Sequence, residues 1–576
     1  MSYEEIISLA SRRGFFWNAY EIYGGVRGFL TWGPLGTIMK RKIADLWRQM
    51  FVHKHEFIEI DSPTIAPYTV WEASGHIEHF KDIMITCANC QRKYKADQLL
   101  EEHGIKDAEL LDIKEIERII REKNIRCPEC GGNLTNPSYF MTMFRTAIGP
   151  YTGNEAFLRP ETAQGMFTEF KRLYIVTRES LPLGIAQIGR GYRNEISPRQ
   201  GPIRLREFDM MELEVFYDPK NPSCPYLTDV ENMKINLLHE KLRLKGEDKP
   251  EEITIKEALE SGYIISEWLA YFMGLAQEFM IKLGIPREKQ RFKEKLPGER
   301  AHYSRQTFDQ EVYLSRWGWV EVSGHADRSD YDLSRHMKMS GQDLTAKRYL
   351  KTPVVVEKRI VKPKIESIKK VFPNIGRIMQ EISRRKPEQI LKDLEDKGYI
   401  QIGDLKLDKS MFEIITEKEK ISVERFVPYV AEPSFGLDRV SYATLEYAYR
   451  KKENRVILSL PPYIAPIEAA VFPIVDKPQF TEIALRIKED LVKEGFKVIY
   501  EAKESIGRRY ARIDEIGVPV AFTVDGQTIE DNTVTARDRD TWKQVRIKID
   551  DCGKLVRLLL KLGSFNKALE SIGIHP

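Results

Sequence analysis

The chain has few cysteines, no long apolar run and almost no excess of one charge. Six cysteines in 576 residues are too few for a disulfide-stabilised secreted protein. No uninterrupted apolar stretch approaches the ~20 residues that span a bilayer. The amino terminus also lacks the basic and apolar segments of a signal peptide. We therefore expect a soluble, cytoplasmic protein without a membrane segment.

The near-balance of charge limits which partners the chain can attract. A net charge of +4, from 90 Lys and Arg against 86 Asp and Glu, excludes the long-range field of a histone-like protein. A nucleic-acid partner would have to be bound by local basic patches. With 42% hydrophobic residues the composition is that of a globular protein, and the length predicts about four domains.

Hydrophobic periodicity predicts the main elements. Apolar residues recur at helical spacing from 35 to 50, and a short strand at 57–61 follows. A strand, a helix and a β-hairpin are predicted in 155–217, whereas 219–300 is expected to be mostly helical. After a proline-rich linker at 461–466, strands alternate with helices, which is typical of a small α/β domain with parallel strands.

Four of the six cysteines form two Cys-x-x-Cys pairs, Cys87 with Cys90 and Cys127 with Cys130. Each pair offers two thiolates from one tight turn, and four thiolates complete the tetrahedral shell of a structural zinc ion. The alternative is two unrelated turns with reduced cysteines, because the separation of the pairs exceeds the usual spacing. We favour zinc because Pro128 and the glycines after Cys130 supply the turns that such a site needs.

The most informative segment is the predicted hairpin of residues 189–195 and 204–214. If both arms are strands, Arg193 and Glu195 share one face of the first, and Arg204, Phe208 and Glu212 share one face of the second. The guanidinium group of arginine can donate two parallel hydrogen bonds to phosphate oxygens, a phenylalanine ring stacks on a base, and carboxylates accept hydrogen bonds from amino groups. The pattern suggests a site for a nucleotide and an amine, although a salt-bridged surface hairpin would show the same pattern.

Two further segments favour the binding site. Glu161 lies where a predicted strand passes into a helix, and Glu432 and Ser434 share one face of another predicted strand. Arg439 then falls in the first turn of a helix, where a cation opposes the helix dipole and needs an anionic partner. A phosphate would meet this need better than a surface salt bridge.

These segments together resemble the three motifs of class II aminoacyl-tRNA synthetases. Motif 1 would be the helix and proline-ended strand of 35–63, motif 2 the hairpin of 189–217, and motif 3 the strand and helix around Arg439. Residues 159–165 (RPETAQG), 324–330 (GHADRSD) and 432–436 (EPSFG) are similar to glycyl-tRNA synthetases of the archaeal and eukaryotic homodimeric type. The resemblance covers nearly the whole chain, with two departures, Val322 where many relatives carry cysteine and Asp438 where many carry glycine.

The resemblance implies an α+β fold. A class II catalytic core, built on an antiparallel β-sheet with helices and inserted subdomains, would precede a carboxyl-terminal α/β anticodon-binding domain. The expected order is core with motif 1 (1–80), zinc-ribbon-like insertion (81–145), core with motif 2 (146–218), helical insertion (219–300), core (301–344), insertion (345–425), core with motif 3 (426–460) and anticodon-binding domain (463–576).

The resemblance also implies roles for individual residues. Arg193 and Arg439 would be catalytic, Arg193 on the α-phosphate of ATP and Arg439 on the adenine, opposite Phe208. Glu321 would help to hold Mg²⁺ on ATP. The full ATP site would comprise Arg193, Asn194, Glu195, Arg204, Leu205, Phe208, Glu321, Val322 and Arg439. The glycine pocket would comprise Glu161, Glu212, Glu432, Pro433 and Ser434.

The implied activity is that of a glycine–tRNA ligase. The enzyme would activate glycine with ATP to glycyl-adenylate and transfer the glycyl group to the 3′ end of tRNA-Gly, with Mg²⁺, a structural Zn²⁺ and a second copy of the chain as partners. One alternative is a synthetase of the same subclass for proline, threonine or histidine, against which the carboxylates Glu161, Glu212 and Glu432 argue. The other is an inactive synthetase-like protein that binds nucleic acid, against which the retained arginines argue.

Overall fold

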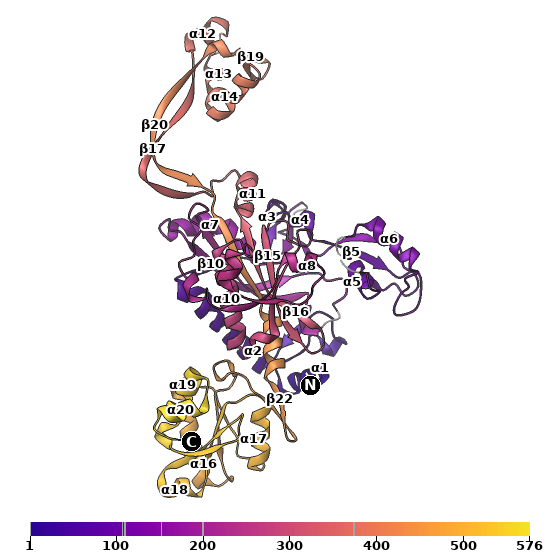
Figure 1. Cartoon of the computed structure of the whole chain (residues 1–576), viewed down its shortest axis with the longest axis vertical. Coiled ribbons are helices and arrows are strands. Elements are labelled where there is room, and N and C mark those ends of the chain that lie inside the picture. Colours follow the sequence, from indigo (N-terminus) through magenta and orange to yellow (C-terminus); the bar gives the residue numbers. More distant parts are fainter. Residues whose placement is uncertain are drawn as a thin grey trace. The chain divides into compact units, whose positions relative to one another are not determined.

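The computed structural model describes residues 2–105, 108, 111–150, 153–198, 201–372 and 375–575. The chain divides into two compact units, Met1–Leu344 with Val427–Pro576, and Thr345–Phe426 (Figure 1). No helix among the described residues is long and apolar enough to cross a membrane.

A mostly antiparallel sheet forms the centre of the larger unit. Among the described residues it has nine strands, in the order β13-β12-β14-β15-β16-β21-β11-β10-β3. Neighbouring strands are antiparallel except for β12 with β14 and β10 with β3. The bounds are β3 Ile58–Glu59, β10 Leu183–Tyr192, β11 Glu207–Tyr217, β12 Lys234–Leu238, β13 Glu251–Thr254, β14 Gln290–Glu294, β15 Gln306–Leu314, β16 Gly318–Ser329 and β21 Tyr429–Gly436.

The two faces of β11 are chemically different. Met211, Leu213 and Val215 point into the main hydrophobic core, together with the helices α2 (Pro34–Trp47), α10 (Glu267–Lys282) and α15 (Leu437–Ala448). The opposite face carries Glu212, Glu214 and Phe216, and Phe216 packs on Phe170 of helix α7 (Ala163–Val176), with ring centroids 4.6 Å apart. Strand alternation therefore places acidic side chains between the sheet and α7.

Smaller elements of this unit precede and flank the sheet. A module around the four paired cysteines has its own apolar core, which includes Ile85, Leu99 and Ile116. Its bounds are β5 Lys81–Thr86, β6 Lys93–Lys95, α5 Ala96–Glu101, α6 Ile113–Glu122 and β7 Ser138–Met141. The other elements are α1 Tyr3–Arg13, β1 Phe16–Asn18, β2 Leu30–Trp32, β4 Ile65–Pro67, α3 Tyr68–Ser74, α4 His76–His79, β8 Arg145–Ala147, β9 Glu155–Leu158, α11 Tyr331–Ser340, β22 Tyr449–Lys452 and β23 Arg455–Leu458.

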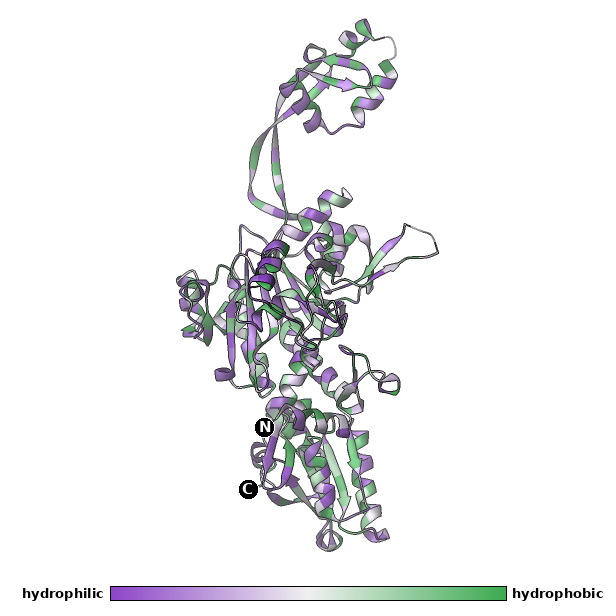
Figure 2. Ribbon diagram, turned by 90° about the vertical axis from the view of Figure 1, so that its right-hand side faces the viewer, coloured by the Kyte–Doolittle hydropathy of each residue, from purple (hydrophilic) through white to green (hydrophobic). Residues whose placement is uncertain are grey.

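Residues 467–575 form an α/β domain with a mixed sheet, in the order β25-β24-β26-β27-β28. The strands are β24 Ala469–Pro473, β25 Val498–Tyr500, β26 Val520–Val524, β27 Thr533–Asp538 and β28 Gln544–Lys548, and the helices are α16 Pro478–Lys493, α17 Ile506–Glu515, α18 Gly526–Asp531, α19 Cys552–Leu562 and α20 Phe565–Ser571. The central strands β24 and β26 are fully buried, and Figure 2 shows apolar strands in this domain. The prediction of parallel strands holds for β24, β25 and β26 but is wrong for β27 and β28, which pair antiparallel.

The smaller unit consists of a long two-stranded ribbon and a compact helical end. Strands β17 (Ala346–Pro363) and β20 (Phe412–Phe426) pair antiparallel. Helices α12 (Ile365–Val371), α13 (Ile375–Ser383) and α14 (Pro387–Asp396) and the hairpin of β18 (Tyr399–Ile402) and β19 (Leu405–Asp408) follow β17. Their apolar core contains Ile368, Leu394 and Leu407.

Two predictions about the connecting segments were wrong. Residues 219–300 are helical only in part: they contain the long helix α10 and the short helices α8 (Glu240–Leu244) and α9 (Ile255–Glu260), but β12, β13 and β14 add three strands to the central sheet. These strands are four or five residues long, too short for a clear period-two signal. The expected linker 461–466 packs against the main core instead: Ile464 belongs to that core, and Ala465 is also fully buried.

Candidate active site

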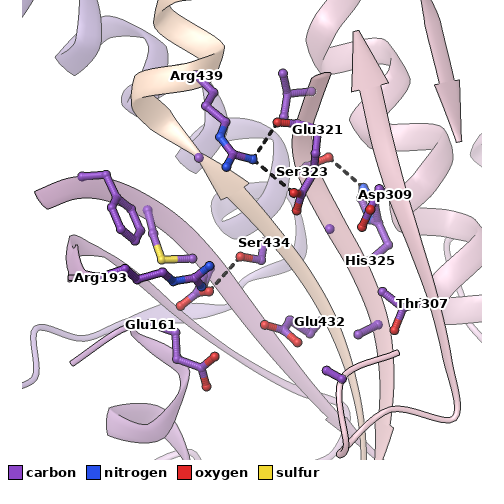
Figure 3. A pocket seen from close by; sticks show the side chains of 18 of the residues that line it. Glu161, Arg193, Thr307, Asp309, Glu321, Ser323, His325, Glu432, Ser434 and Arg439 are labelled. Atoms are coloured by element: carbon purple, nitrogen blue, oxygen red, sulfur yellow. Dashed lines mark hydrogen bonds and ion pairs between the residues drawn. The ribbon is translucent and has the colours of Figure 1, made fainter. Parts of the chain in front are cut away.

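A cavity of about 540 Å³ opens on the acidic face of the central sheet. Its floor is formed by β11, β16 and β21, and its walls include the segment after β10 and the first turn of α15. Arg439 and Glu321 lie at one end, Glu161 and Glu432 lie at the other, and Arg193 reaches in between them (Figure 3).

Most of the predicted site residues line this cavity. They are Glu161, Arg193, Glu195, Arg204, Leu205, Phe208, Glu212, Glu321, Val322, Glu432, Ser434 and Arg439. Asn194 and Pro433 are not among the lining residues, contrary to expectation. The backbone N–H of Asn194 donates to the carbonyl oxygen of Thr142 (2.7 Å), and Pro433 points to the other side of β21 from Glu432 and Ser434, as strand alternation requires.

The hairpin brings its residues together differently from the prediction. Strand β10 ends at Tyr192 and β11 begins at Glu207, so period-two alternation aligns Phe208 and Glu212 but not Arg193, Glu195 or Arg204. The latter three reach the cavity from the connecting segment. There the Nε of Arg204 donates to Glu195 Oε2 (2.7 Å). The guanidinium carbon of Arg193 lies 5.5 Å from the centre of the Phe208 ring, which is cation–π distance.

Arg439 lies at the arginine end of the cavity, where the protein fixes its guanidinium group. This residue is in the first turn of α15, where the sequence predicted an anionic partner. Its Nη1 lies 3.1 Å from Glu321 Oε2 and donates to the backbone oxygen of Glu321 (2.9 Å), while its Nε donates to the backbone oxygen of Ile203 (2.8 Å). Three contacts fix the guanidinium plane against the cavity wall.

The acidic end consists of three buried glutamates. Glu212 Oε2 accepts from the backbone N–H of Thr162 (2.6 Å), and Glu212 Oε1 accepts from the hydroxyl of Ser434 (2.7 Å). Glu161 Oε1 lies 3.2 Å from His76 Nε2. Glu432 is the third, and its Oε2 accepts from Arg328 Nη1 (2.9 Å).

Arg328 connects the acidic residues. Its Nε and Nη2 donate to the carboxylate of Asp332 at 2.8 and 3.0 Å, and its Nη2 lies 3.7 Å from Glu161 Oε1. The guanidinium also lies 3.6 Å from the centre of the Tyr303 ring, and no part of the side chain reaches solvent. A buried arginine with these partners holds the carboxylates in place.

Burial and mutual repulsion change the acidity of these groups. Burial raises the pKa of Glu432 to about 7, against the opposing effect of Arg328. Burial, together with the neighbouring Glu161, also raises the pKa of Glu212. The pKa of Glu161 lies well below its usual range, because His76 and Arg328 outweigh the effect of burial. Groups of like charge with divergent pKa values are typical of a functional site.

The comparisons with known proteins agree with this geometry. The "tRNA synthetase class II core domain (G, H, P, S and T)" family matches residues 149–348, and the "Anticodon binding domain" family matches residues 468–558. The glycine–tRNA ligase of Aeropyrum pernix is 48% identical over 99% of this chain and 98% of its own length. Those of Pyrococcus horikoshii and Methanocaldococcus jannaschii are 46% and 42% identical, each over 97% of this chain and at least 98% of their own length.

The chain belongs to the glycine–tRNA ligase family.

Two solved structures have a fold similar to that of this glycine–tRNA ligase family member, although their sequences are much less similar to it. The prolyl-tRNA synthetases of Cryptosporidium parvum and Giardia lamblia are each 14% identical, with TM-scores of 0.50 and 0.51. The matches cover 99% and 95% of this chain and 78% and 73% of the other chains. The class II core and the anticodon-binding domain of the sequence prediction are therefore confirmed.

The four paired cysteines of the ligase converge. The Sγ atoms of Cys87 and Cys130 are 3.5 Å apart, those of Cys90 and Cys127 are 3.6 Å apart, and all four lie within 4.8 Å of one another. A tetrahedral zinc shell with Zn–S bonds of about 2.3 Å places its sulfurs about 3.8 Å apart. The alternative of two unrelated turns is wrong, and the four thiols fit a zinc ion.

Sequence reasoning missed the residues that support the glutamates. Arg328 and Thr162 lie within the strings GHADRSD and RPETAQG, and Asp332 follows Arg328 by four residues, so these strings carried a signal. His76 and Tyr303 lie outside any motif and meet the site only through the fold. Asp309 also lines the cavity; burial and the nearby Glu321 raise its pKa to about 7.

Proposed function

We propose that this member of the glycine–tRNA ligase family activates glycine with ATP and transfers it to the 3′ end of tRNA-Gly. The observation that carries the proposal is a single cavity with arginines at one end and three buried glutamates at the other, in a chain 48% identical over nearly its whole length to a glycine–tRNA ligase. One end suits a triphosphate and the other suits an ammonium group.

At the arginine end, the residues would bind and orient ATP. Arg193 would hold the α-phosphate, Phe208 and Arg439 would enclose the adenine, and Glu195 would accept from its amino group. Arg204 would reach the outer phosphates. The glycine carboxylate would attack the α-phosphate and release pyrophosphate, so catalysis would depend on positioning and on charge stabilisation, without a protein nucleophile.

At the acidic end, Glu161, Glu212 and Glu432 would surround the glycine ammonium, and Ser434 would hold Glu212 in place. Carboxylates that already accept hydrogen bonds are preorganised for a cation. Because these side chains would surround the glycine closely, amino acids with larger side chains would be excluded by steric clash. Glycine would therefore be selected without an editing domain.

Two metal ions complete the proposal. Magnesium would neutralise charge on the ATP phosphates, and Glu321 fits it as an oxygen ligand beside the cavity, close to Asp309. Zinc would be structural, because a shell of four thiolates leaves no position open for a substrate. Cys87, Cys90, Cys127 and Cys130 would hold the two turns of the module around them.

The remaining partners are proposed on the match to an anticodon-binding family. Residues 463–576 would bind the anticodon of tRNA-Gly. The insertions at 219–300 and 345–425 would be candidates for contacts to the acceptor stem of the tRNA. We also propose a cytoplasmic homodimer. The apolar side of α2 is not free for this interface, because Met39, Ile43 and Trp47 are fully buried within the chain.

Charging assays test this function. The purified chain should attach glycine to a tRNA-Gly transcript in the presence of ATP and Mg²⁺, and should attach neither proline to tRNA-Pro nor threonine to tRNA-Thr. Charging of tRNA-Pro with proline would favour the rival subclass IIa activity. Binding of tRNA without any charging would favour the inactive synthetase-like protein.

A further inference from the structure

Glu214 is a buried carboxyl that the proposed mechanism does not use. It lies two residues beyond Glu212 on the same face of β11, and its side chain is fully buried beneath the cavity. The register of β11 and β21 pairs Glu212 with Ser434 and Val215 with Ala431, so Glu214 lies opposite Glu432 on the neighbouring strand. Neither oxygen of Glu214 has a hydrogen-bond partner among the described residues.

The groups around Glu214 are mostly acidic. Glu212 on its own strand, Glu432 on β21 and Asp332 on α11 all repel a negative charge at Glu214, and Arg328 on β16 is the cation that opposes them. Arg328 is already engaged, at 2.8 Å by Asp332 and at 2.9 Å by Glu432. A charged and unpaired carboxylate in this position would carry a large desolvation cost, which a proton removes.

We propose that Glu214 positions Glu432 for the glycine ammonium by holding a proton in the free enzyme, and that glycine binding releases this proton. The inference rests on the proposed glycine site. When Glu214 is neutral, the positive charge of Arg328 stabilises the carboxylates of Glu432 and Asp332 and does not also have to stabilise a third. Glu432 can therefore face the cavity as a carboxylate. The ammonium then adds a positive charge beside Glu432, the Glu214 O–H bond breaks, and the proton passes to solvent.

The other titratable groups near the acidic end do not supply this proton. Burial lowers the pKa of His336, which contacts Gln164 and is neutral. Burial raises the pKa of Tyr303 well above its usual value, so its hydroxyl keeps its proton. Glu161 is ionised beside His76, and Glu212 accepts two hydrogen bonds from Thr162 and Ser434. Glu432 accepts from Arg328 Nη1 (2.9 Å), which favours its charged form. Glu214 is the carboxyl of this group without such a donor among the described residues, so the proton of this neighbouring pair rests on Glu214.

Binding and proton release are linked, so glycine affinity must depend on pH. A proton that leaves on binding competes with glycine, and the apparent affinity rises as pH increases through the titration of the acidic pair. Burial raises the pKa of Glu214 well above its usual value, so the KM for glycine should fall with increasing pH between pH 6 and pH 8, by up to about tenfold per pH unit. A Glu214→Gln variant carries no proton to release, and its KM should change less than about twofold over the same range.

Calorimetry on the full chain measures the released proton directly. Glycine is titrated at pH 7 in two buffers of different ionisation enthalpy, and the difference in heat gives the protons released. We expect about half a proton to one proton for the wild type and close to none for Glu214→Gln. Glu446→Gln is the matched control, because Glu446 is also buried with one unpartnered oxygen but does not line the cavity. It should release as much as the wild type.

Each outcome bears on the proposal. Equal release by the wild type and Glu214→Gln, or no release by the wild type, would overturn it. If the variant does not fold, the infrared difference spectrum of the wild type decides, because glycine binding should remove the carbonyl band of a protonated carboxylic acid, and an unchanged band would refute the proposal. Absence of any glycine binding would instead refute the proposed function, whereas binding without proton release would refute this inference alone.

Discussion

Replacing Arg439 with alanine should abolish most of the ATP-dependent chemistry while leaving the fold intact. The guanidinium makes two hydrogen bonds to backbone oxygens and one contact to Glu321, all between 2.8 and 3.1 Å, which fix it beside the proposed adenine site. A charge-assisted hydrogen bond contributes about 1.5–3 kcal/mol, so losing the equivalent of two in the transition state costs about 3–6 kcal/mol. This corresponds to a loss of about two to four orders of magnitude in kcat/KM for ATP.

The assay is ATP–pyrophosphate exchange with glycine at varied ATP. The exchange activity of Arg439→Lys should be less than about tenfold higher than that of Arg439→Ala, because lysine keeps the charge but not the planar guanidinium group. Arg172→Ala provides the control, since this arginine on α7 is 81% exposed and its ion pair with Glu169 is 3.8 Å long; exchange should change less than about twofold. Binding of tRNA by residues 463–576 should be retained in all three variants. Exchange by Arg439→Ala within about fivefold of wild type would refute the proposed role in ATP binding.

Four other predictions concern separate parts of the chain. Glu212→Gln should lower kcat/KM for glycine at least about 30-fold, from the loss of about 2–5 kcal/mol at a buried charged contact, with KM for ATP nearly unchanged in the exchange assay. Metal analysis should find about one zinc per chain and almost none in Cys127→Ser, which should also unfold the cysteine module at lower temperature. His55, whose pKa burial lowers to about 4, binds fewer protons folded than unfolded, so stability should fall as pH decreases from 6.5 towards 4, and the melting temperature of His55→Gln should be less sensitive to this change. Asp514→Asn should destabilise the carboxyl-terminal domain by about 3–5 kcal/mol in denaturant unfolding, because it leaves the buried guanidinium of Arg537, now paired at 2.8 and 2.9 Å, without its counter-charge.

Much of the site could be predicted because its residues lie close together in sequence within regular elements. Glu432 and Ser434 are two apart on β21, and Arg439 follows in the first turn of α15, so periodicity alone placed all three. The same reasoning failed for Arg193 and Arg204, since it assumed that the strands continue through residues 193–204. Both residues reach the cavity from the segment between β10 and β11, whose path cannot be predicted from the periodicity of the sequence.

The support of the site could not be predicted because it depends on contacts between distant segments. Arg328 meets Glu432 across 104 positions of sequence, and His76 meets Glu161 from a helix of four residues. Short strands caused the error over residues 219–300. Strands β12, β13 and β14 carry too few residues to show alternation, and they join the sheet because β14 pairs with β15, β12 with β14, and β13 with β12. The convergence of the four cysteines could be predicted because chemistry, not periodicity, fixes their number and spacing.

The selectivity of pyrophosphate exchange tests the central claim most directly, namely that Glu161, Glu212 and Glu432 form a pocket for glycine next to a site for ATP. The purified chain is incubated with ATP, Mg²⁺, labelled pyrophosphate and one amino acid at a time. Exchange should occur with glycine and should be at least about a hundredfold slower with alanine, proline, threonine and histidine. Exchange with proline or threonine but not with glycine, or exchange with none, would contradict the account.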